Sequence, residues 1–143
     1  MKVRFRQTNT TDAEAISKLS KQLGYTTEIE DAISYINTLH SSDKDDLIVA
    51  ELEGEVIAWM QLSYILRVES GYFAEITGIV VDGDYRSTGI GKMLVDYAKE
   101  WCGVKDVYRL RVRTNIARLR THDFYERNGF TLCKEQKVFE MNL

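Results

Sequence analysis

The sequence predicts one α/β domain, residues 1–143, built on a mixed β-sheet with helices on both faces. Its 143 residues, 44% of them hydrophobic, are enough to form one buried core. Strand-like and helix-like patterns follow one another in the order βααβββαβαββ. A helical pattern separates the strand-like segments 73–81 and 107–113, which predicts a crossover between two parallel strands.

The N-terminal part predicts one strand and two helices. Residues 3–5 alternate apolar and charged side chains, as a half-buried strand does. Thr11 and Glu14 have the spacing of a capping box, which predicts the start of a first helix. Thr27 and Glu30 repeat this spacing and predict the start of a second helix.

The middle of the chain predicts a three-stranded meander followed by a helix. The predicted strands are 47–52, 56–66 and 72–81, and Glu53-Gly54 forms the first tight turn between them. Apolar residues at helical spacing then predict a helix over 89–102.

The C-terminal part predicts a strand, a helix and two final strands. Residues 107–113 alternate, with Arg109, Arg111 and Arg113 on one face. A helical pattern follows over 116–128. We expect the last two strands over 130–133 and 138–141.

Composition excludes several classes of function. The formal net charge of −3 argues against a protein that binds nucleic acid by neutralising phosphates. The chain shows no apolar run of membrane-spanning length and no signal-peptide core, so we expect a cytoplasmic protein without a membrane partner. Cys102 and Cys133 are isolated, which predicts small core residues and neither a disulfide nor a metal site.

The segment most informative about chemistry is an apolar strand, a polar loop and a helix that begins near Gly89 and Gly91. Successive N–H groups at a helix N-terminus bind anions, and glycine lets a phosphate approach the backbone closely. A Walker P-loop is excluded because Met93 stands where Ser or Thr is required. A dinucleotide fingerprint is weak because Leu94 stands where the third glycine is required.

The remaining pattern is Arg-x-x-Gly-x-Gly after a strand, formed by residues 86–91. With it, and with Phe124-Tyr125 followed by Gly129-Phe130, the sequence resembles the GNAT acyltransferase superfamily. The resemblance covers nearly the whole chain, including the order of the elements. It implies a GNAT-like fold with a splayed sheet, and an N-acetyltransferase that moves an acetyl group from acetyl-CoA to a primary amine by direct attack.

The resemblance also implies which residues contact acetyl-CoA. Amides of the loop hold the pyrophosphate, and the end of the preceding strand pairs with the pantetheine arm. An N–H near Ile79 or Val80 polarises the thioester carbonyl, as in an oxyanion hole. The implied contact residues of this strand and loop are Ile79, Val80, Val81, Arg86, Ser87, Thr88, Gly89, Ile90, Gly91 and Lys92.

Acyl transfer to an amine needs a base for the amine and an acid for the thiolate. The resemblance implies Tyr125 as the acid, and packing beside Phe124 is its alternative role. Glu75 is the candidate base because some GNAT members carry a base in a similar Phe-Ala-Glu-Ile context; a water relay is the alternative. Regular alternation places Glu75 on the face of Ile79, unless a β-bulge changes the register.

The predicted last helix departs from the family pattern at one position. The family often has an asparagine that contacts CoA about seven residues before the helix tyrosine, and here that residue is Arg118. Arg118 is expected either to reach CoA or to be a solvated charge. Asn115 lies nearby and has the alternative role of helix N-cap. For His122 we expect packing or surface exposure.

The acceptor is expected between the first two helices and the hairpin that begins at 56. We expect a small-molecule amine rather than a protein, and the sequence leaves its identity and homodimer formation open. The alternative functions are a CoA-binding regulatory or sensor module without turnover, and an interaction domain that has lost the cofactor. The residues of the expected acceptor region, all aromatic or acidic except Gln61, are Tyr25, Glu28, Glu30, Asp31, Tyr35, Trp59, Gln61, Tyr64 and Tyr72.

Overall fold

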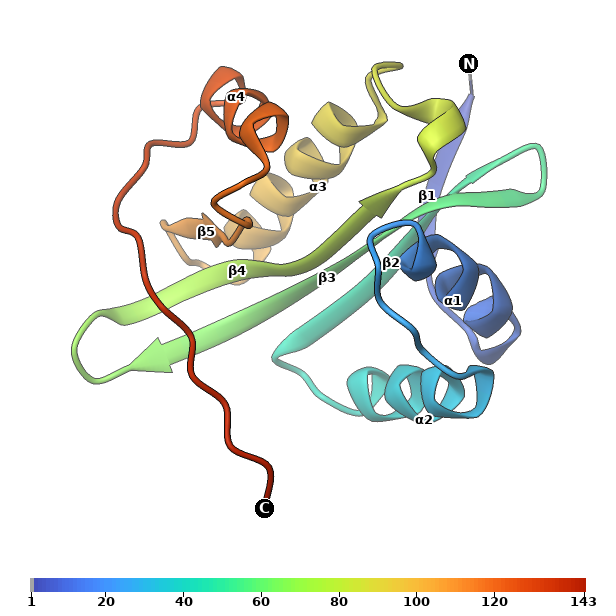
Figure 1. Ribbon diagram of the computed structural model, residues 1–143, viewed down its shortest axis with the longest axis horizontal. Helices are drawn as coiled ribbons and strands as arrows, with labels where there is room; N and C mark the ends of the chain where they lie inside the picture. Colours follow the sequence, from blue (N-terminus) through green and yellow to red (C-terminus); the bar gives the residue numbers. More distant parts are fainter. Residues whose placement is uncertain (1) are drawn as a thin grey trace. The chain divides into compact units, whose positions relative to one another are not determined.

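The computed structural model describes residues 2–143, in which four α-helices, two short 3-10 helices and one five-stranded sheet are formed (Figure 1). The chain divides into two compact units, of which the first ends at Arg113 and the second spans Thr114–Leu143. The whole sheet and the first three α-helices lie in the first unit. The predicted α/β fold class is confirmed.

The sheet of the first unit has the strand order β1-β2-β3-β4-β5. Neighbours from β1 to β4 pair antiparallel, whereas β4 and β5 pair parallel, which confirms the predicted crossover. The fifth strand is shorter than the predicted 107–113, because only Leu110 to Val112 pair with β4, where their partners are Ala74 to Ile76. The strands are β1 (Val3–Gln7), β2 (Asp45–Leu52), β3 (Glu55–Arg67), β4 (Gly71–Val81) and β5 (Leu110–Val112).

Strand β4 contains a β-bulge at Thr77. Gln61 of β3 pairs with Gly78, but the next residue, Leu62, pairs with Ile76. Thr77 is therefore an extra residue on β4, and the alternation of side chains reverses beyond it.

The bulge decides which face of the sheet carries Glu75. Glu75 pairs with Ser63, whereas Ile79 pairs with Met60. Ser63 and Met60 are three residues apart on β3, so their side chains point to opposite faces. Glu75 and Ile79 therefore lie on opposite faces, which corrects the parity expected for a regular strand.

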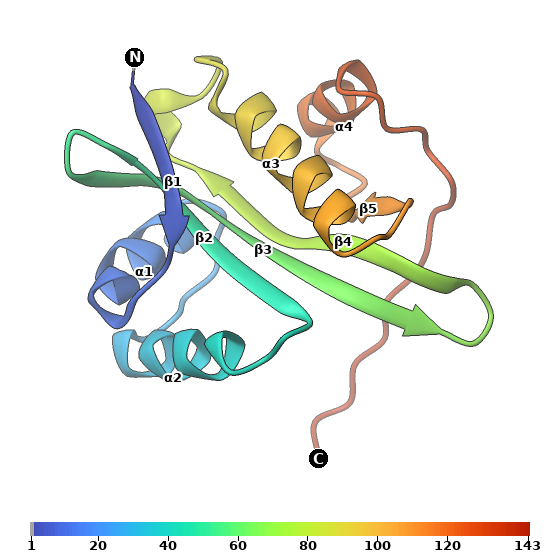
Figure 2. The same cartoon turned by 180° about the vertical axis from the view of Figure 1, so that it is seen from behind.

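Helices cover both faces of this sheet, as Figures 1 and 2 show. Helices α1 (Ala13–Lys21) and α2 (Ile29–His40) pack on one face, where Leu47 and Trp59 join their apolar residues. We call this the α1/α2 face. Helix α3 (Ile90–Val104) covers the other face, which we call the α3 face. No helix within residues 2–143 is long and apolar enough to cross a membrane.

The two predicted capping boxes are not formed. Asn9 and Asp12 make a capping box instead, at the 3-10 helix Thr10–Asp12 that leads directly into α1. Helix α2 begins after Glu28, whose side chain makes no capping hydrogen bond. At the first predicted box, Thr11 cannot be the N-cap because Asn9 already has that role and accepts the N–H of Thr11.

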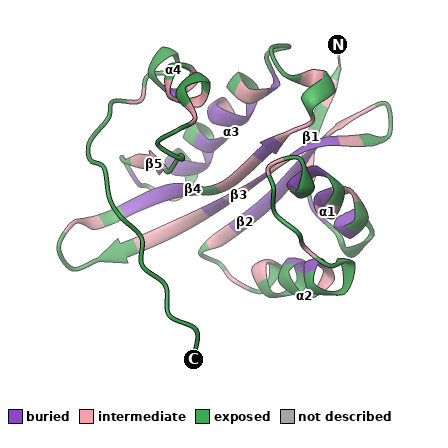
Figure 3. Ribbon diagram, in the orientation of Figure 1, coloured by how far each residue is buried: buried purple, intermediate pink, exposed green. Residues whose placement is uncertain are grey.

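The core of the first unit follows the central strands and the inner side of α3 (Figure 3). Ile48, Met60 and Leu62 have no exposed surface, and Leu94 of α3 has none either. Burial of these aliphatic side chains is the main stabilising contribution to the sheet and its α3 cover.

The second unit contains α4 (Leu119–Arg127) and the segment after it. The helix is shorter than the predicted 116–128. The strands predicted over 130–133 and 138–141 are not formed, because no strand within residues 128–143 pairs with another. Cys133 of this segment is exposed, which corrects its expected core position, whereas Cys102 of α3 is buried; both cysteines are free.

Candidate functional site

The loop between β4 and α3 begins with a tight turn around Asp82. The N–H of Asp84 donates to Oδ1 of Asp82 at 3.0 Å, and the N–H of Tyr85 donates to the Asp82 carbonyl at 2.9 Å. The N–H of Gly83 donates to Oε1 of Gln22 at 2.9 Å. Because Gln22 ends α1, the start of the loop is tied to the α1/α2 face.

The second half of the loop forms the N-terminus of α3. Ser87 and Gly89 have φ values of 63° and 92°, and Gly89 is the N-cap of α3. The N–H of Met93 donates to the Gly89 carbonyl at 3.1 Å, and helix geometry leaves the amides before it without intrahelical acceptors. These amides and the positive end of the helix dipole favour a negatively charged group.

Two basic side chains lie at this helix N-terminus. Arg86 is exposed, and its Nε donates to the carbonyl of Val81 at 3.4 Å. Lys92 is exposed and pairs with Asp96 one helical turn later, at 3.1 Å. Both cations are accessible to a phosphate group. Ile90, in contrast, is buried and anchors the first turn of α3 in the core.

The last part of β4 is paired on one side. Ile79, Val80 and Val81 pair with residues 58–60 of β3. On the other side the register with β5 ends at Ile76. Within the described residues, the end of β4 thus runs on past its parallel neighbour, as a splayed sheet requires.

A row of polar side chains crosses the sheet on the α1/α2 face. The strand registers place Asp45, Ser63, Glu75 and Arg111 side by side. The Ser63 hydroxyl donates to Oδ1 of Asp45 at 2.6 Å. Glu75 is only 7% exposed, and its Oε1 accepts from Nε of Arg113 at 2.9 Å. Glu75 is therefore a buried carboxylate oriented by an ion pair.

Trp59 and Gly78 pack closely next to this row. A Cβ at Gly78 would lie 2.7 Å from both Cη2 and Cζ3 of Trp59. Gly78 is thus the residue that lets the indole lie against β4. The indole Nε1 is buried and has no hydrogen-bond partner within residues 2–143.

Tyr125 is the buried aromatic residue of α4. It is 7% exposed, and its ring contacts Phe124 and Phe130 edge-on, with centroids 5.3 and 5.4 Å away. Burial raises the pKa of Tyr125 to about 12, although the cation of Arg118 acts in the opposite direction. The hydroxyl therefore keeps its proton throughout the neutral range.

Asn115 and Arg118 lie at the start of α4. Arg118 is the N-cap residue, so the N-cap role considered for Asn115 is wrong. Asn115 closes a turn instead, since its Oδ1 accepts the N–H of Ala117 at 2.8 Å. Nε2 of His122 lies 3.0 Å from the Asn115 carbonyl, and His122 is half-buried. His122 therefore has a local packing role within the second unit.

The sequence match decides the family. A family model described as the acetyltransferase (GNAT) family matches residues 13–130, well over half of the chain. The chain belongs to the GNAT acetyltransferase family. The match includes the strand, loop and helix described above, together with α4.

Individual GNAT proteins resemble the chain in sequence or in structure. An uncharacterized N-acetyltransferase of Methanocaldococcus jannaschii is 29% identical over 98 residues, which are 67% of this chain and 43% of that protein. The chain thus aligns with less than half the length of that relative.

Two solved structures share the GNAT fold over nearly the whole chain. An aminoglycoside N-acetyltransferase in complex with CoA has a TM-score of 0.87 at 18% identity, over 99% of this chain and 96% of its own. Glucosamine-6-phosphate N-acetyltransferase from Arabidopsis thaliana has a TM-score of 0.85 at 20% identity, over 99% of this chain and 100% of its own.

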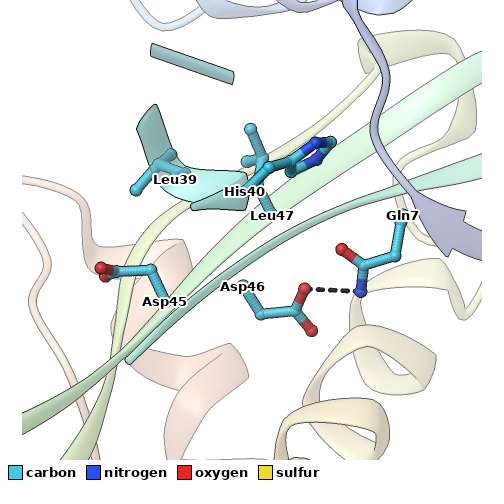
Figure 4. Close-up of a pocket in the computed structure, with 6 residues that line it drawn as sticks. All are labelled: Gln7, Leu39, His40, Asp45, Asp46 and Leu47. Atoms are coloured by element: carbon cyan, nitrogen blue, oxygen red, sulfur yellow. Dashed lines mark hydrogen bonds between the residues drawn. The ribbon is translucent and has the colours of Figure 1, made fainter. Parts of the chain in front are cut away.

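A hollow of about 290 Å³ lies where α2 ends and β2 begins (Figure 4). The amide of Gln7 donates to Oδ1 of Asp46 at 2.6 Å, and the Tyr97 hydroxyl donates to Oδ2 at 3.2 Å. Asp45 accepts from Ser42 and Ser63. Protein groups thus already bind both carboxylates, and no residue of the loop 82–89 lines the hollow.

The residues expected near the acceptor separate into three groups. Trp59 and Gln61 lie on the α1/α2 face, whereas the stacked rings of Tyr64 and Tyr72 lie on the α3 face. This position of Tyr64 and Tyr72 corrects the expectation. The remaining residues, on or before α2, are all exposed: Tyr25, Glu28, Glu30, Asp31 and Tyr35.

Sequence reasoning missed the partners of Glu75. Arg113 and Ser63 became its neighbours only through the registers of β4 with β5 and β3. The alternation of arginines over 109–113 was a usable signal that these side chains share a face. That pattern alone could not predict that Glu75 is the residue of β4 that lies beside these arginines.

Proposed function

We propose that this GNAT chain is an N-acetyltransferase that moves an acetyl group from acetyl-CoA to a primary amine. The observation that carries the proposal is the unit formed by the end of β4, the loop 82–89 and the N-terminus of α3. It combines unpaired helix amides, two accessible cations and a strand end without a β5 partner. The structurally similar aminoglycoside N-acetyltransferase was solved in complex with CoA, which supports the proposal that this chain binds acetyl-CoA.

The proposed binding mode assigns one part of CoA to each part of this unit. The amides of residues 87–92 bind the pyrophosphate, and Arg86 and Lys92 add positive charge. The end of β4 pairs with the pantetheine arm as an added strand would. An N–H at Ile79 or Val80 donates to the thioester carbonyl and stabilises the developing oxyanion. Asn115 and Arg118 are proposed as further contacts.

The proposed reaction is a direct attack of the acceptor amine on the thioester of acetyl-CoA. The amine nitrogen forms a bond to the carbonyl carbon, and the carbon–sulfur bond breaks. Glu75, directly or through a water, takes the proton that the amine loses. Its burial and its ion pair with Arg113 support this role, because they hold the carboxylate in one orientation.

Tyr125 is the proposed acid for the leaving thiolate. A pKa of about 12 keeps its hydroxyl protonated, so it can donate to the sulfur at any neutral pH. The proposed acceptor is a small-molecule amine that approaches from the α1/α2 face, where Glu75 lies. The aminoglycoside acceptor in the name of the similar structure is consistent with this size class.

Binding and turnover test the proposal separately. Acetyl-CoA at one hundred times its Kd should stabilise the native protein by about 2.7 kcal/mol and raise Tm accordingly. Arg86→Gln should weaken this effect. Lys99→Gln removes the same charge from an exposed position further along α3 and should not. Amines from a small panel should then release free CoA thiol.

Two results would decide against the proposal. Absence of stabilisation by saturating acetyl-CoA would exclude the acyl-CoA site. Stabilisation without thiol release, with every amine of a broad panel, would favour the sensor module over the enzyme.

A further inference from the structure

Three arginine side chains surround one buried ring on the α1/α2 face. The guanidinium carbon of Arg111 lies 4.2 Å from the centroid of Phe73, and those of Arg67 and Arg109 lie 5.8 Å from it. Phe73 itself has no exposed surface. The three side chains come from β3, from β5 and from the segment just before β5, so the fold brings them together. We call these residues the arginine cluster.

The positive charge of the arginine cluster is not balanced locally. Within the first unit, residues 2–113, none of its three members forms an ion pair with a carboxylate. Arg109 donates to the carbonyls of Ser70 and Tyr72, which carry no net charge. The neighbouring carboxylate, Glu75, is paired with Arg113. The cluster is thus locally positive, although the formal net charge of the whole chain is −3.

Covering Phe73 does not by itself require three cations. The alkyl stem of an arginine covers apolar surface, and its guanidinium interacts favourably with an aromatic face. Three guanidinium groups around one ring repel one another, and a leucine or methionine would cover the ring without that repulsion. Clustered arginines are, in contrast, the usual means of binding a carboxylate or a phosphate.

The arginine cluster lies beside the proposed base. Arg111 pairs with Glu75 in the β4–β5 register, and Phe73 precedes Glu75 by two residues on the same face. The cluster is therefore within reach, along β4, of an acceptor whose amine lies beside Glu75 on this face.

We propose that the arginine cluster binds an anionic group of the acceptor, a carboxylate or a phosphate, at the end remote from the reacting amine. This inference rests on the proposed acetyl transfer, which defines where the amine lies. Val80 is seven residues beyond Phe73, which corresponds to roughly 20 Å of strand, less the shortening at the bulge. Arginine side chains shorten this gap further.

The separation defines the class of acceptor. In an α-amino acid, a single carbon atom joins the amine and the carboxylate, so the two groups cannot reach both sites. An elongated amine with an anion roughly 15 Å away can do so. An extended peptide of five residues has about this reach, at roughly 3.4 Å per residue.

A series of matched peptides tests the inference. Gly-Gly-Gly-Gly-Ser amide, the same peptide with Asp in place of Ser, and the phosphoserine form share one amine and differ in the final charge. Binding is measured calorimetrically in the presence of CoA, so the readout does not need turnover. The Asp and phosphoserine peptides should bind about tenfold or more tightly than the Ser peptide, as charge-assisted hydrogen bonds would produce. The ratio of the affinities of the Asp and phosphoserine peptides shows whether the cluster prefers a carboxylate or a phosphate.

Protein variants and a short peptide supply the controls. Arg111→Met keeps an apolar cover over Phe73 and should abolish the preference for the anion, whereas Arg111→Lys should restore part of it. Arg4→Gln removes one exposed charge from β1, at the opposite edge of the sheet, and should preserve the preference. The dipeptide Gly-Asp amide is too short to reach the cluster and should show no gain over Gly-Ser amide.

Equal affinity for the three long peptides, including no binding by any of them, would overturn the inference. So would an anion preference that persists in Arg111→Met. Thiol release from acetyl-CoA with neutral amines is independent of both results, so the acetyltransferase proposal can stand or fall separately.

Discussion

Replacing Gly78 by alanine should destabilise the protein, because the new methyl group would overlap Trp59. The added Cβ would lie 2.7 Å from two ring carbons, whereas carbon atoms in contact are separated by about 3.5–4.0 Å. The indole also packs against the apolar cluster under α1 and α2, so it cannot move away freely. The backbone of Gly78 itself has no positive φ, so the effect is one of packing.

The size of this effect follows from two opposing contributions. Overpacking in a filled interior costs about 1–3 kcal/mol. Replacing glycine by alanine restricts the unfolded chain and stabilises by about 0.4–1 kcal/mol. We expect a net loss of about 1–2 kcal/mol in the free energy of unfolding. Urea denaturation should show a lower midpoint with an unchanged slope.

Two further variants identify the cause. Gly103→Ala introduces the same methyl group on α3 at a position with nothing within 4 Å, and should stabilise by about 0.5–1 kcal/mol. Trp59→Phe removes the two overlapping carbons and the unpartnered indole N–H. Combined with Trp59→Phe, Gly78→Ala should cost less than about 0.5 kcal/mol. The reasoning is refuted if Gly78→Ala is as stable as the wild type, or if its effect is the same with and without Trp59→Phe.

Two predictions concern Tyr125. Tyr125→Phe should lower kcat about 10²-fold or more without changing affinity for acetyl-CoA, because only the acid is lost; an unchanged single-turnover rate would contradict this role. Burial raises the pKa of Tyr125 to about 12, from 10 in the unfolded chain, so the native state retains this proton longer. The associated stability is complete below pH 10 and is lost as pH rises through 12, on the order of 2–3 kcal/mol. Denaturation at pH 8 to 11 should show the decline, and Tyr125→Phe should reduce it.

Most of the first unit was predictable from local patterns. The turn at Glu53-Gly54 is formed, with φ values of 51° and 83°, and the strands on both sides of it pair as expected. Helix α3 follows from its apolar spacing and buries Leu94 and Ala98. These features depend on residues close together in the sequence, so local periodicity is sufficient to predict them.

The strands predicted after α4 were wrong for a physical reason. Phe139 and Met141 have the spacing of one face of a strand, but 90% and 78% of their surfaces are exposed. A strand exists only where a second strand pairs with its backbone, and alternation says nothing about that partner. Helix α4, in contrast, makes its hydrogen bonds internally and was predicted within a few residues.

The candidate site was predictable in its loop and less so in its strands. The conformation of residues 86–91 at the start of α3 depends on their own backbone, with positive φ at Ser87 and Gly89. The position of Glu75 depends on the bulge at Thr77, and its ion pair depends on the register that brings Arg113 beside it. Both depend on pairing between separate strands, so the sequence could suggest the carboxylate but not its surroundings.

The bulge at Thr77 reverses the alternation of side chains along β4, so odd-numbered residues point to one face before it and to the other face after it. Glu75 and Val80 share a face although an odd number of positions separates them, which a regular strand does not permit. The Glu75 carboxylate and the end of the strand are on the same side because one extra residue lies between them. A related protein with a straight strand would have to carry its carboxylate one position earlier or later to present it on this face. The number of residues in this strand therefore matters to the proposed site as much as the identity of the base.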